Sequence, residues 1–265
     1  MTAIGTQVLI VGGGPVGLAT AMELTFQGVD CVVVEPRRTV SATRPRAKTT
    51  SARSMELFRR WGFAGEVRKR APIEVGWSSD IAFCTSATGR EITRFTGVLG
   101  LDLIRTDLAA EPGQQVAQPV VEQALRDALA HSARARLLIG QRVLAIKAHE
   151  DQVTGVIADD AGATTNFAAD YVVGADGARS IVRKAMGATY TGGNAGRPNL
   201  SIVFRSPRLG EHLAGPPALH YWVLNPDAPG VVGPLNLAGT WWAIATGRPD
   251  DDRADPAVLV SPARA

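Results

Sequence analysis

The sequence predicts an α/β fold in which a mainly parallel sheet with helices is joined to a separate antiparallel sheet. Residues 7–35 have the pattern of a strand, a tight turn, a helix and a second strand, which is the order of a βαβ unit. Residues 200–245 instead hold several short strand-like runs, at 200–204, 219–224, 231–237 and 240–245. The chain has 265 residues, enough for one large domain or two modest ones.

The composition excludes several other classes of protein. Hydrophobic residues make up 45% and charged residues 20%, which excludes disorder, collagen-like repeats and coiled coil. No apolar run approaches the roughly 18 residues that a membrane span needs, and no Lys or Arg precedes Arg37, as a signal peptide would require. We therefore expect a cytoplasmic protein with no membrane partner. Cys31 and Cys84 show no zinc-ligand spacing and are expected to be buried thiols.

The first predicted strand runs directly into a glycine-rich turn. Residues 8–11 are continuously apolar, which is typical of a parallel strand buried on both faces. The next residues, Gly12-Gly13-Gly14-Pro15-Val16-Gly17, match G-x-G-x-x-G, whose glycines permit a tight turn, a close pyrophosphate and helix packing on the strand. One apolar helical face follows over residues 18–25, and Gly28 fits a cap at its end.

An acidic residue ends the second strand of this unit. Glu35 follows the strand Cys31–Val34 at the offset where a carboxylate accepts hydrogen bonds from an adenosine ribose. The pattern favours dinucleotide binding over a purely structural turn. Leu18 stands where a P-loop needs Lys, which excludes a nucleotide triphosphatase. An acid at Glu35 would repel a ribose 2′-phosphate, which argues against NADP in this groove and leaves FAD and NAD open.

Basic residues gather directly after this unit. Eleven Lys or Arg residues lie between Arg37 and Arg70, opposed within that stretch only by Glu56 and Glu66. Such a stretch is typical of a nucleic-acid surface, a solvated helix face or a site for one phosphorylated cofactor.

The glycine turn, Glu35, Arg46, Arg53 and residues 54–59 together resemble the start of the FAD-dependent aromatic hydroxylases. These are flavoprotein monooxygenases of the phenol and para-hydroxybenzoate hydroxylase type. The resemblance implies a Rossmann-like FAD-binding domain with an antiparallel β-sheet substrate domain. It also implies FAD as cofactor, NADH or NADPH as reductant, and hydroxylation of a phenolic or polyketide-like aromatic substrate by O2.

The resemblance further implies which residues bind the cofactor. Residues 174–180 are similar to the family's Asp-Gly turn, which lies near the FAD pyrophosphate, whereas Asp-Gly is also a common structural turn. Gln118 opens a helix similar to the family's Gln-x-x-Leu-Glu segment, and a plain helix start is the alternative. The predicted cofactor-binding residues are Gly12, Gly13, Gly14, Pro15, Val16, Gly17, Glu35, Pro36, Arg37, Arg46, Arg53, Gln118, Asp176 and Gly177.

We expect the FAD-binding domain to comprise residues 1–74 and 101–187, and a partial substrate-binding sheet to comprise residues 75–100 and 188–265. Trp222, Trp241 and Trp242 are candidates for the substrate wall, with the sheet core as the alternative. The sequence contains no G-x-S-x-G or H-E-x-x-H motif, and its four histidines have no metal-ligand spacing. We therefore predict no catalytic side chain and no metal site, since the cofactor supplies the chemistry.

The family's third motif, a Gly-Asp pair that holds the flavin side of FAD, has no counterpart here. The fold is therefore expected to be incomplete at its C-terminal end. Two function classes stay open: a hydroxylase present as its N-terminal part or completed by another chain, and a non-catalytic remnant that binds FAD or ADP. We expect a small aromatic substrate and no nucleic acid as partner, with a homo-oligomer or a complementing chain as open alternatives.

Overall fold

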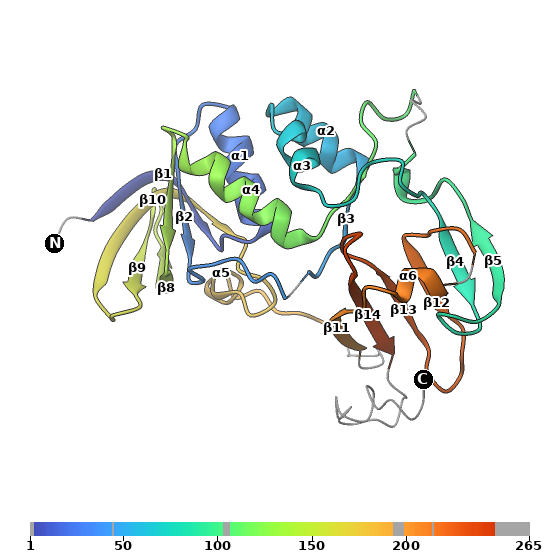
Figure 1. Cartoon of the computed structure of the whole chain (residues 1–265). Helices are drawn as coiled ribbons and strands as arrows, with labels where there is room; N and C mark the ends of the chain where they lie inside the picture. Colours follow the sequence, from blue (N-terminus) through green and yellow to red (C-terminus); the bar gives the residue numbers. More distant parts are fainter. Residues whose placement is uncertain (1–2, 44, 103–106, 193–198, 214, 247–265) are drawn as a thin grey trace. The chain divides into compact units, whose positions relative to one another are not determined.

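The computed structural model describes residues 3–43, 45–102, 107–192, 199–213 and 215–246 (Figure 1). Arg44 of the basic stretch and residues 247–265 lie outside this part of the chain. The chain divides into two compact units, residues 1–42 with 118–192 and residues 43–117 with 193–265. This division groups residues 43–74 and 101–117 with the second unit, whereas the sequence-based boundaries assigned them to FAD binding; that assignment stays a prediction.

The first unit is built on a six-stranded sheet in the order β7-β2-β1-β10-β9-β8. Its first four strands are parallel, and β9 and β8 continue the sheet in antiparallel fashion. Leu9 and Ile10 point to opposite faces and both have no exposed surface, which confirms burial on both faces. The strands are β1 (Ile4–Val11), β2 (Cys31–Glu35), β7 (Ala135–Ile139), β8 (Gln141–Ala148), β9 (Val153–Asp159) and β10 (Thr164–Gly174).

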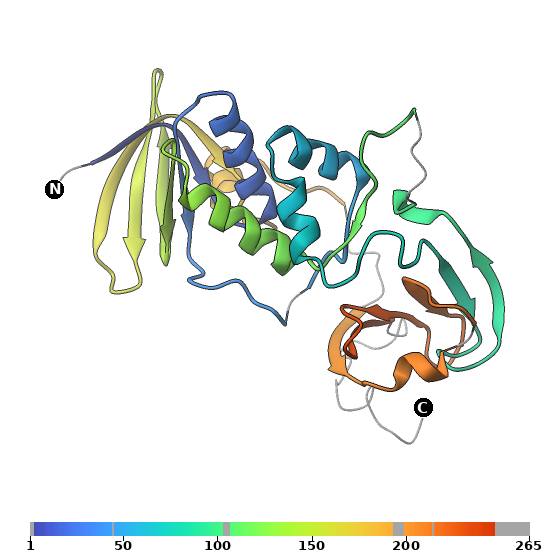
Figure 2. The same cartoon turned by 45° about the horizontal axis from the view of Figure 1, so that its top comes forward.

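The helices of this unit are α1 (Pro15–Phe26), α4 (Gln118–Ala130) and α5 (Ile181–Ala185). Helices α1 and α4 pack against each other and lie side by side in Figures 1 and 2. Gly28 ends α1 as predicted, with φ of 81° and its N–H bonded to the Thr25 carbonyl at 3.1 Å. The N–H of Val29 reaches the Leu24 carbonyl at 2.8 Å, which completes a Schellman cap. This cap sets where the chain turns back into β2.

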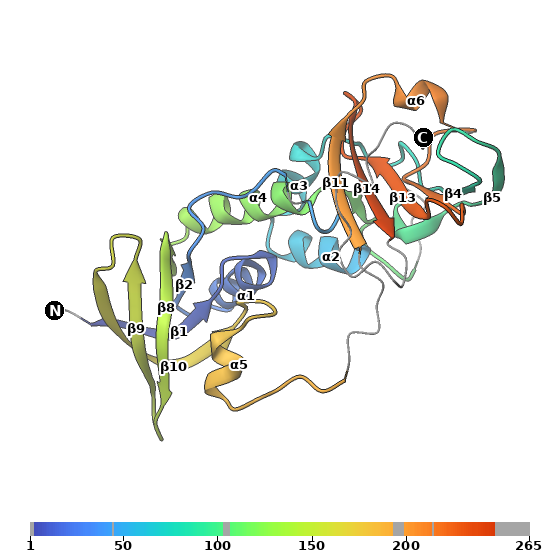
Figure 3. The ribbon, with the colours of Figure 1, turned by 90° about the horizontal axis from the view of Figure 1, so that it is seen from below.

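The second unit carries another six-stranded sheet, in the order β11-β14-β13-β12-β4-β5 (Figure 3). It is antiparallel except where β12 pairs with β4. One face packs Tyr221, Val232 and Trp241 into a core. The strands are β4 (Ile81–Cys84), β5 (Glu91–Phe95), β11 (Asn199–Arg205), β12 (His220–Val223), β13 (Gly230–Pro234) and β14 (Thr240–Thr246).

A short two-stranded ribbon and several helices complete the second unit. The ribbon pairs β3 (Thr49–Thr50) with β6 (Gln114–Gln115). Ser51 caps the following helix by accepting a hydrogen bond from the Ser54 N–H at 3.2 Å. The helical elements are α2 (Ala52–Arg60), α3 (Ala64–Arg70), the 3-10 turn η1 (Val98–Gly100) and α6 (Leu209–His212).

Both cysteines are buried thiols, as predicted. Burial, with a contribution from Asp30, raises the pKa of Cys31 to about 11. Across the described ranges, no helix is both long and apolar enough to cross a bilayer.

Candidate dinucleotide-binding site

Three predicted motifs meet at one edge of the first sheet. Strands β2, β1 and β10 are adjacent and parallel, and Val11 at the end of β1 pairs with both Val34 and Gly174. The glycine turn follows β1, Glu35 ends β2, and the Asp-Gly turn follows β10. The carboxyl ends of parallel strands are where α/β folds bind nucleotides.

Tight packing explains two glycines of the first turn. Gly12 has φ of 105°, and a Cβ atom there would collide with the Ala175 carbonyl. A Cβ atom at Gly17 would collide with the carbonyl of Gly12. The Ala175 N–H also donates to the Val11 carbonyl at 2.8 Å. The glycine turn and the Asp-Gly turn therefore lie directly against each other.

Gly14 differs from these neighbours because packing within the chain does not require a glycine there. A Cβ atom at Gly14 would meet nothing closer than Arg37 Nη2, at 4.0 Å. The backbone of Gly14, with φ of −80° and ψ of −176°, is extended and accessible to any residue. The open space at Gly14 is the kind that lets a ligand approach the backbone closely.

The N-terminus of α1 faces the same space. Gly14 is its N-cap residue and provides no side-chain cap, and Pro15 stands in the first turn. Val16, in that first turn, has 69% of its surface exposed. Uncapped N–H groups and the helix dipole together favour a pyrophosphate at this position.

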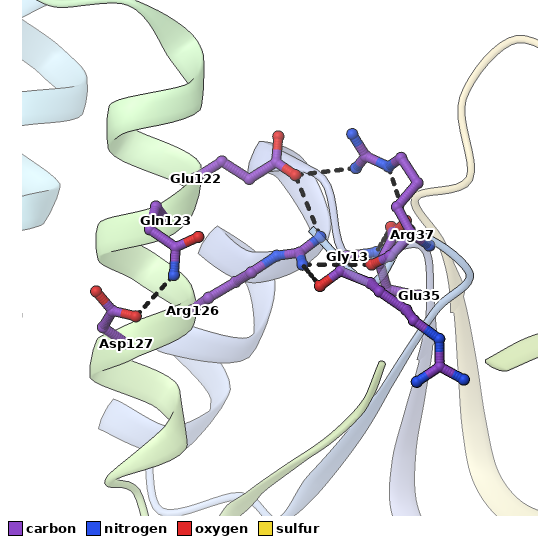
Figure 4. Close-up of polar contacts among 8 residues, drawn as sticks. Gly13, Glu35, Arg37, Glu122, Gln123, Arg126 and Asp127 are labelled. Carbon is purple, nitrogen blue, oxygen red and sulfur yellow. Dashed lines mark hydrogen bonds and ion pairs between the residues drawn. The ribbon is translucent and has the colours of Figure 1, made fainter. Parts of the chain in front are cut away.

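Glu35 is buried and hydrogen-bonded both to the glycine turn, at Gly13, and to Arg37 (Figure 4). Its Oε2 accepts from the Gly13 N–H at 2.7 Å, and its Oε1 accepts from the N–H and the Nε of Arg37, both at 2.8 Å. Burial raises the pKa of Glu35, but the hydrogen bonds from Arg37 and Gly13 outweigh it and hold the pKa below its ordinary value. The carboxylate is thus kept ionised and oriented at the predicted ribose position.

Helix α4 holds Arg37 through two residues that the sequence did not single out as site residues. Glu122 Oε1 accepts from Arg37 Nη2 at 2.9 Å and from Arg126 Nη2 at 3.4 Å (Figure 4). Arg126 Nη1 also donates to the carbonyls of Arg37 and Arg38, each at 3.4 Å. Glu122 and Arg126 are almost completely buried. The i,i+4 spacing of Glu122 and Arg126 on α4 indicates an ion pair between them. Their shared partner Arg37 is 85 residues from Glu122, so the sequence did not indicate it.

In the Asp-Gly turn, only one of the two carboxylate oxygens of Asp176 accepts a hydrogen bond from the described residues. Asp176 Oδ2 accepts from the Ile181 N–H at 2.6 Å, at the start of α5. Asp176 Oδ1 is buried and has no hydrogen-bond partner among the described residues. Gly177 has φ of 76°, a conformation that favours glycine. An unpaired buried carboxylate oxygen beside the glycine turn suits a ligand hydroxyl or a bound water.

The remaining predicted residues are placed less closely around this edge. Pro36 is exposed beside Glu35, and Gln118 is the partly buried first residue of α4. Arg46 and Arg53 are exposed and belong to the second unit. Arg53 there pairs with Glu56 at 3.3 Å. Within the described part of the chain, no group of His, Cys, Asp or Glu is arranged to hold a metal ion.

Comparison with known proteins identifies the family. The sequence profile of a family described as "FAD binding domain" matches residues 5–260. The chain belongs to this FAD-binding domain family. This match confirms the predicted FAD cofactor and the family resemblance, and the mainly parallel sheet with a second, mainly antiparallel sheet confirms the predicted α/β fold class.

Relatives of this FAD-binding domain include a monooxygenase-dioxygenase and a putative polyketide hydroxylase. It is 32% identical over 252 residues to tetracenomycin B2 monooxygenase-dioxygenase of Streptomyces olivaceus, covering 88% of this chain and 45% of the relative. It is 29% identical over 267 residues to a putative polyketide hydroxylase of Streptomyces halstedii, covering 94% and 45%. The chain thus spans about half the length of the curated relatives that it matches.

Solved structures of FAD-bound enzymes also resemble this chain. The flavin-dependent monooxygenase PieE, in complex with FAD and substrate, matches this FAD-binding domain with a TM-score of 0.86 and 28% identity, over 99% of this chain and 46% of that chain. A ternary complex of aklavinone-11 hydroxylase with FAD and aklavinone matches with a TM-score of 0.81 and 28% identity, over 96% and 48%.

The residues at the sheet edge fit the adenosine diphosphate half of FAD. Open space at Gly14 and the uncapped start of α1 suit the pyrophosphate. The ionised Glu35 carboxylate suits ribose hydroxyls. The unpaired Asp176 oxygen offers a further acceptor.

Proposed function

We propose that this FAD-binding domain holds the cofactor of a monooxygenase that hydroxylates a phenolic or polyketide-like aromatic ring. The reaction takes NADH or NADPH, a proton, O2 and the aromatic C–H, and gives oxidised nicotinamide, water and the phenol. The observation that carries the cofactor-binding part of the proposal is the joint placement of the open Gly14 backbone, Glu35 and Asp176 at one sheet edge. The hydroxylation part is supported by the named activities of its relatives.

The chain's own residues would bind and orient the cofactor. We assign the pyrophosphate to the backbone of residues 14–17 and the ribose to Glu35, with Arg37 alongside. Bound FAD would supply the redox chemistry of the reaction. The full assignment to the cofactor is Gly12, Gly13, Gly14, Pro15, Val16, Gly17, Glu35, Pro36, Arg37, Arg46, Arg53, Gln118, Asp176 and Gly177.

The alternative is a chain that binds FAD or ADP without oxidising a substrate. It is favoured by one observation: the groups brought together at the sheet edge all suit the adenosine diphosphate half of the cofactor. A cytoplasmic location, the absence of a nucleic-acid partner, and a homo-oligomer or complementing chain stay predictions alongside either function.

Calorimetry and product analysis test the proposal. We expect the purified chain to bind FAD and ADP, and Glu35→Ala to lose roughly 1.5–3 kcal/mol of ADP binding, as charged hydrogen bonds disappear. Binding of NAD in preference to FAD would contradict the flavoprotein assignment. Oxidation of NADH or NADPH with formation of a hydroxylated phenol would exclude the binding-only alternative, and FAD binding without that product would favour it.

A further inference from the structure

A row of polar aromatic groups crosses the face of the second sheet that lies opposite its core. Gly233 on β13 pairs with Trp242 on β14, and a Cβ atom at Gly233 would lie 2.9 Å from two atoms of the indole. The Trp242 ring meets His220 of β12 edge-on, with ring centroids 5.1 Å apart and planes at 86°. The missing side chain at Gly233 therefore lets Trp242 lie across β13 and contact His220.

Lys48 lies over the same indole. Its Nζ is 4.4 Å from the centre of the Trp242 ring, a cation–π distance. The Lys48 carbonyl accepts from the Val116 N–H at 2.9 Å, and Gln115 Nε2 donates to the Pro234 carbonyl at 3.4 Å. The first contact holds Lys48 at the end of the β3–β6 ribbon, and the side-chain hydrogen bond of Gln115 ties that ribbon to β13.

The polar atoms of this cluster lack ordinary partners. Trp242 is 3% exposed, yet its Nε1 is buried without a hydrogen-bond partner among the described residues, and the same holds for His220 Nε2. No carboxylate in the described ranges pairs with Lys48. Burial, together with the charge of Lys48, lowers the pKa of His220 to about 4, so its imidazole is neutral near pH 7. A buried indole N–H without an acceptor is uncommon enough to require an explanation.

One class of ligand would satisfy both the ammonium of Lys48 and the indole N–H of Trp242. A partly buried ammonium with no acid beside it attracts an anion, and the indole N–H donates to an oxygen acceptor. The surrounding rings offer a flat apolar contact: Trp222 stacks on Phe83 at 6.3 Å on the same face, and Trp222 is 40% exposed. An aromatic ring that carries an ionised oxygen combines both requirements.

We infer that Lys48, Trp242 and His220 form a subsite for the anionic oxygen, phenolate or carboxylate, of an aromatic substrate. The inference rests on the proposed function, whose aromatic substrate class it narrows to rings with an ionised oxygen. Trp242 Nε1 and His220 Nε2 are both buried. The anion therefore reaches them only when it binds the Lys48 ammonium and the flexible lysine side chain moves away from the indole face. Lys48 then serves as the residue that selects anionic over neutral rings.

A matched pair of probes tests this subsite in the full chain. 2-Naphthoate and 2-naphthamide have the same bicyclic ring, but only the first is an anion. With indole 15N labelling, we expect 2-naphthoate to shift the Trp242 N–H resonance, identified by its loss in Trp242→Phe, and to bind at least tenfold tighter than the amide. Lys48→Met should remove that preference, Lys48→Arg should keep most of it, and Lys69→Met, at an exposed lysine of the same unit, should leave it unchanged.

Three results would overturn the inference: equal affinity for the two probes, equal behaviour of Lys48→Met and Lys69→Met, or naphthoate binding that leaves the Trp242 resonance in place. The comparison of probes on the unaltered chain needs no variant, so it decides even if Lys48→Met fails to fold. FAD binding is measured on the same samples. If the unaltered chain binds FAD but does not prefer naphthoate over the amide, only the subsite is contradicted. If it binds naphthoate in a Lys48-dependent way but does not bind FAD, only the proposed function is contradicted.

Discussion

At Gly14, an added methyl group would meet no described atom outside its chain neighbours closer than 4.0 Å, whereas at Gly12 and Gly17 it would collide with backbone carbonyls. Gly14→Ala should therefore keep the stability of the chain and lose at least about tenfold in ADP affinity, since the methyl group occupies space near the pyrophosphate. Gly14→Val should abolish binding. Calorimetry and thermal unfolding measure the two effects separately.

Gly5→Ala is the matched control for this prediction, because Gly5 lies in β1 with nothing within 4 Å of an added Cβ atom. It should change neither property. If Gly14→Ala binds ADP as tightly as Gly5→Ala does, the pyrophosphate is not at Gly14.

The lowered pKa of Glu35 predicts how stability depends on pH. A carboxyl whose pKa is lower in the folded than in the unfolded chain stabilises the fold above its ordinary pKa, and that contribution is lost as pH falls through the folded value. Glu35→Gln should therefore reduce the free energy of unfolding most at neutral pH, by about 2 kcal/mol from weakened charged hydrogen bonds. The difference from the unaltered chain should shrink in acid.

Asp160→Asn provides the comparison, since the Asp160–Arg38 ion pair is largely exposed and should contribute little at any pH. Urea unfolding at a series of pH values measures both variants. A Glu35→Gln effect that is constant from neutral to acid pH would contradict the assigned ionisation.

At the scale of elements, helix α4 does more than pack against α1: two of its side chains also hold Arg37 at the site. Glu122 lies between the guanidinium groups of Arg37 and Arg126, and both α4 residues are buried. Arg126→Met should destabilise the chain by about 3 kcal/mol, because a buried charge network loses one partner. The double variant Glu122→Leu with Arg126→Met should cost about 1–2 kcal/mol less than the sum of the two single changes. Additive effects would show that the two residues act independently.

At the scale of the whole molecule, four of the eleven basic residues of the basic stretch are paired with acids from outside it. Acids from outside residues 37–70 pair with its arginines: Glu35 and Glu122 with Arg37, Asp160 with Arg38, and Glu111 with Arg59 and Arg68. Charge counted along the sequence cannot include these partners, since folding alone brings them near.

We predict that this neutralisation weakens binding to nucleic acid. Random duplex DNA should bind weakly, and binding should disappear by about 0.2 M salt, as expected of nonspecific phosphate contacts. Fluorescence anisotropy at increasing salt measures it. Tight binding that resists salt would instead mean that the arginines form a nucleic-acid surface.

Local patterns were sufficient to predict β1, α1 and β2, because a buried strand, a glycine turn and a helical face each lie within a few residues. They also indicated the runs that became β11 to β14. The hold of Glu122 on Arg37 could not be predicted, because 85 residues separate the partners. The contact of Lys48 with Trp242 likewise depends on how the β3–β6 ribbon meets β13.

The three predicted motifs lie at the carboxyl ends of three neighbouring strands, so their separation is set by the strand spacing of about 4.8 Å. Side chains alternate between the faces of a sheet, and one inserted residue reverses the alternation for everything that follows in that strand. An insertion inside β1, β2 or β10 would therefore turn a motif to the wrong face. Length changes in the turn between β8 and β9, residues 149–152, leave all three strands in register. The chain should therefore tolerate length changes at residues 149–152 and should not tolerate insertions inside β1, β2 or β10.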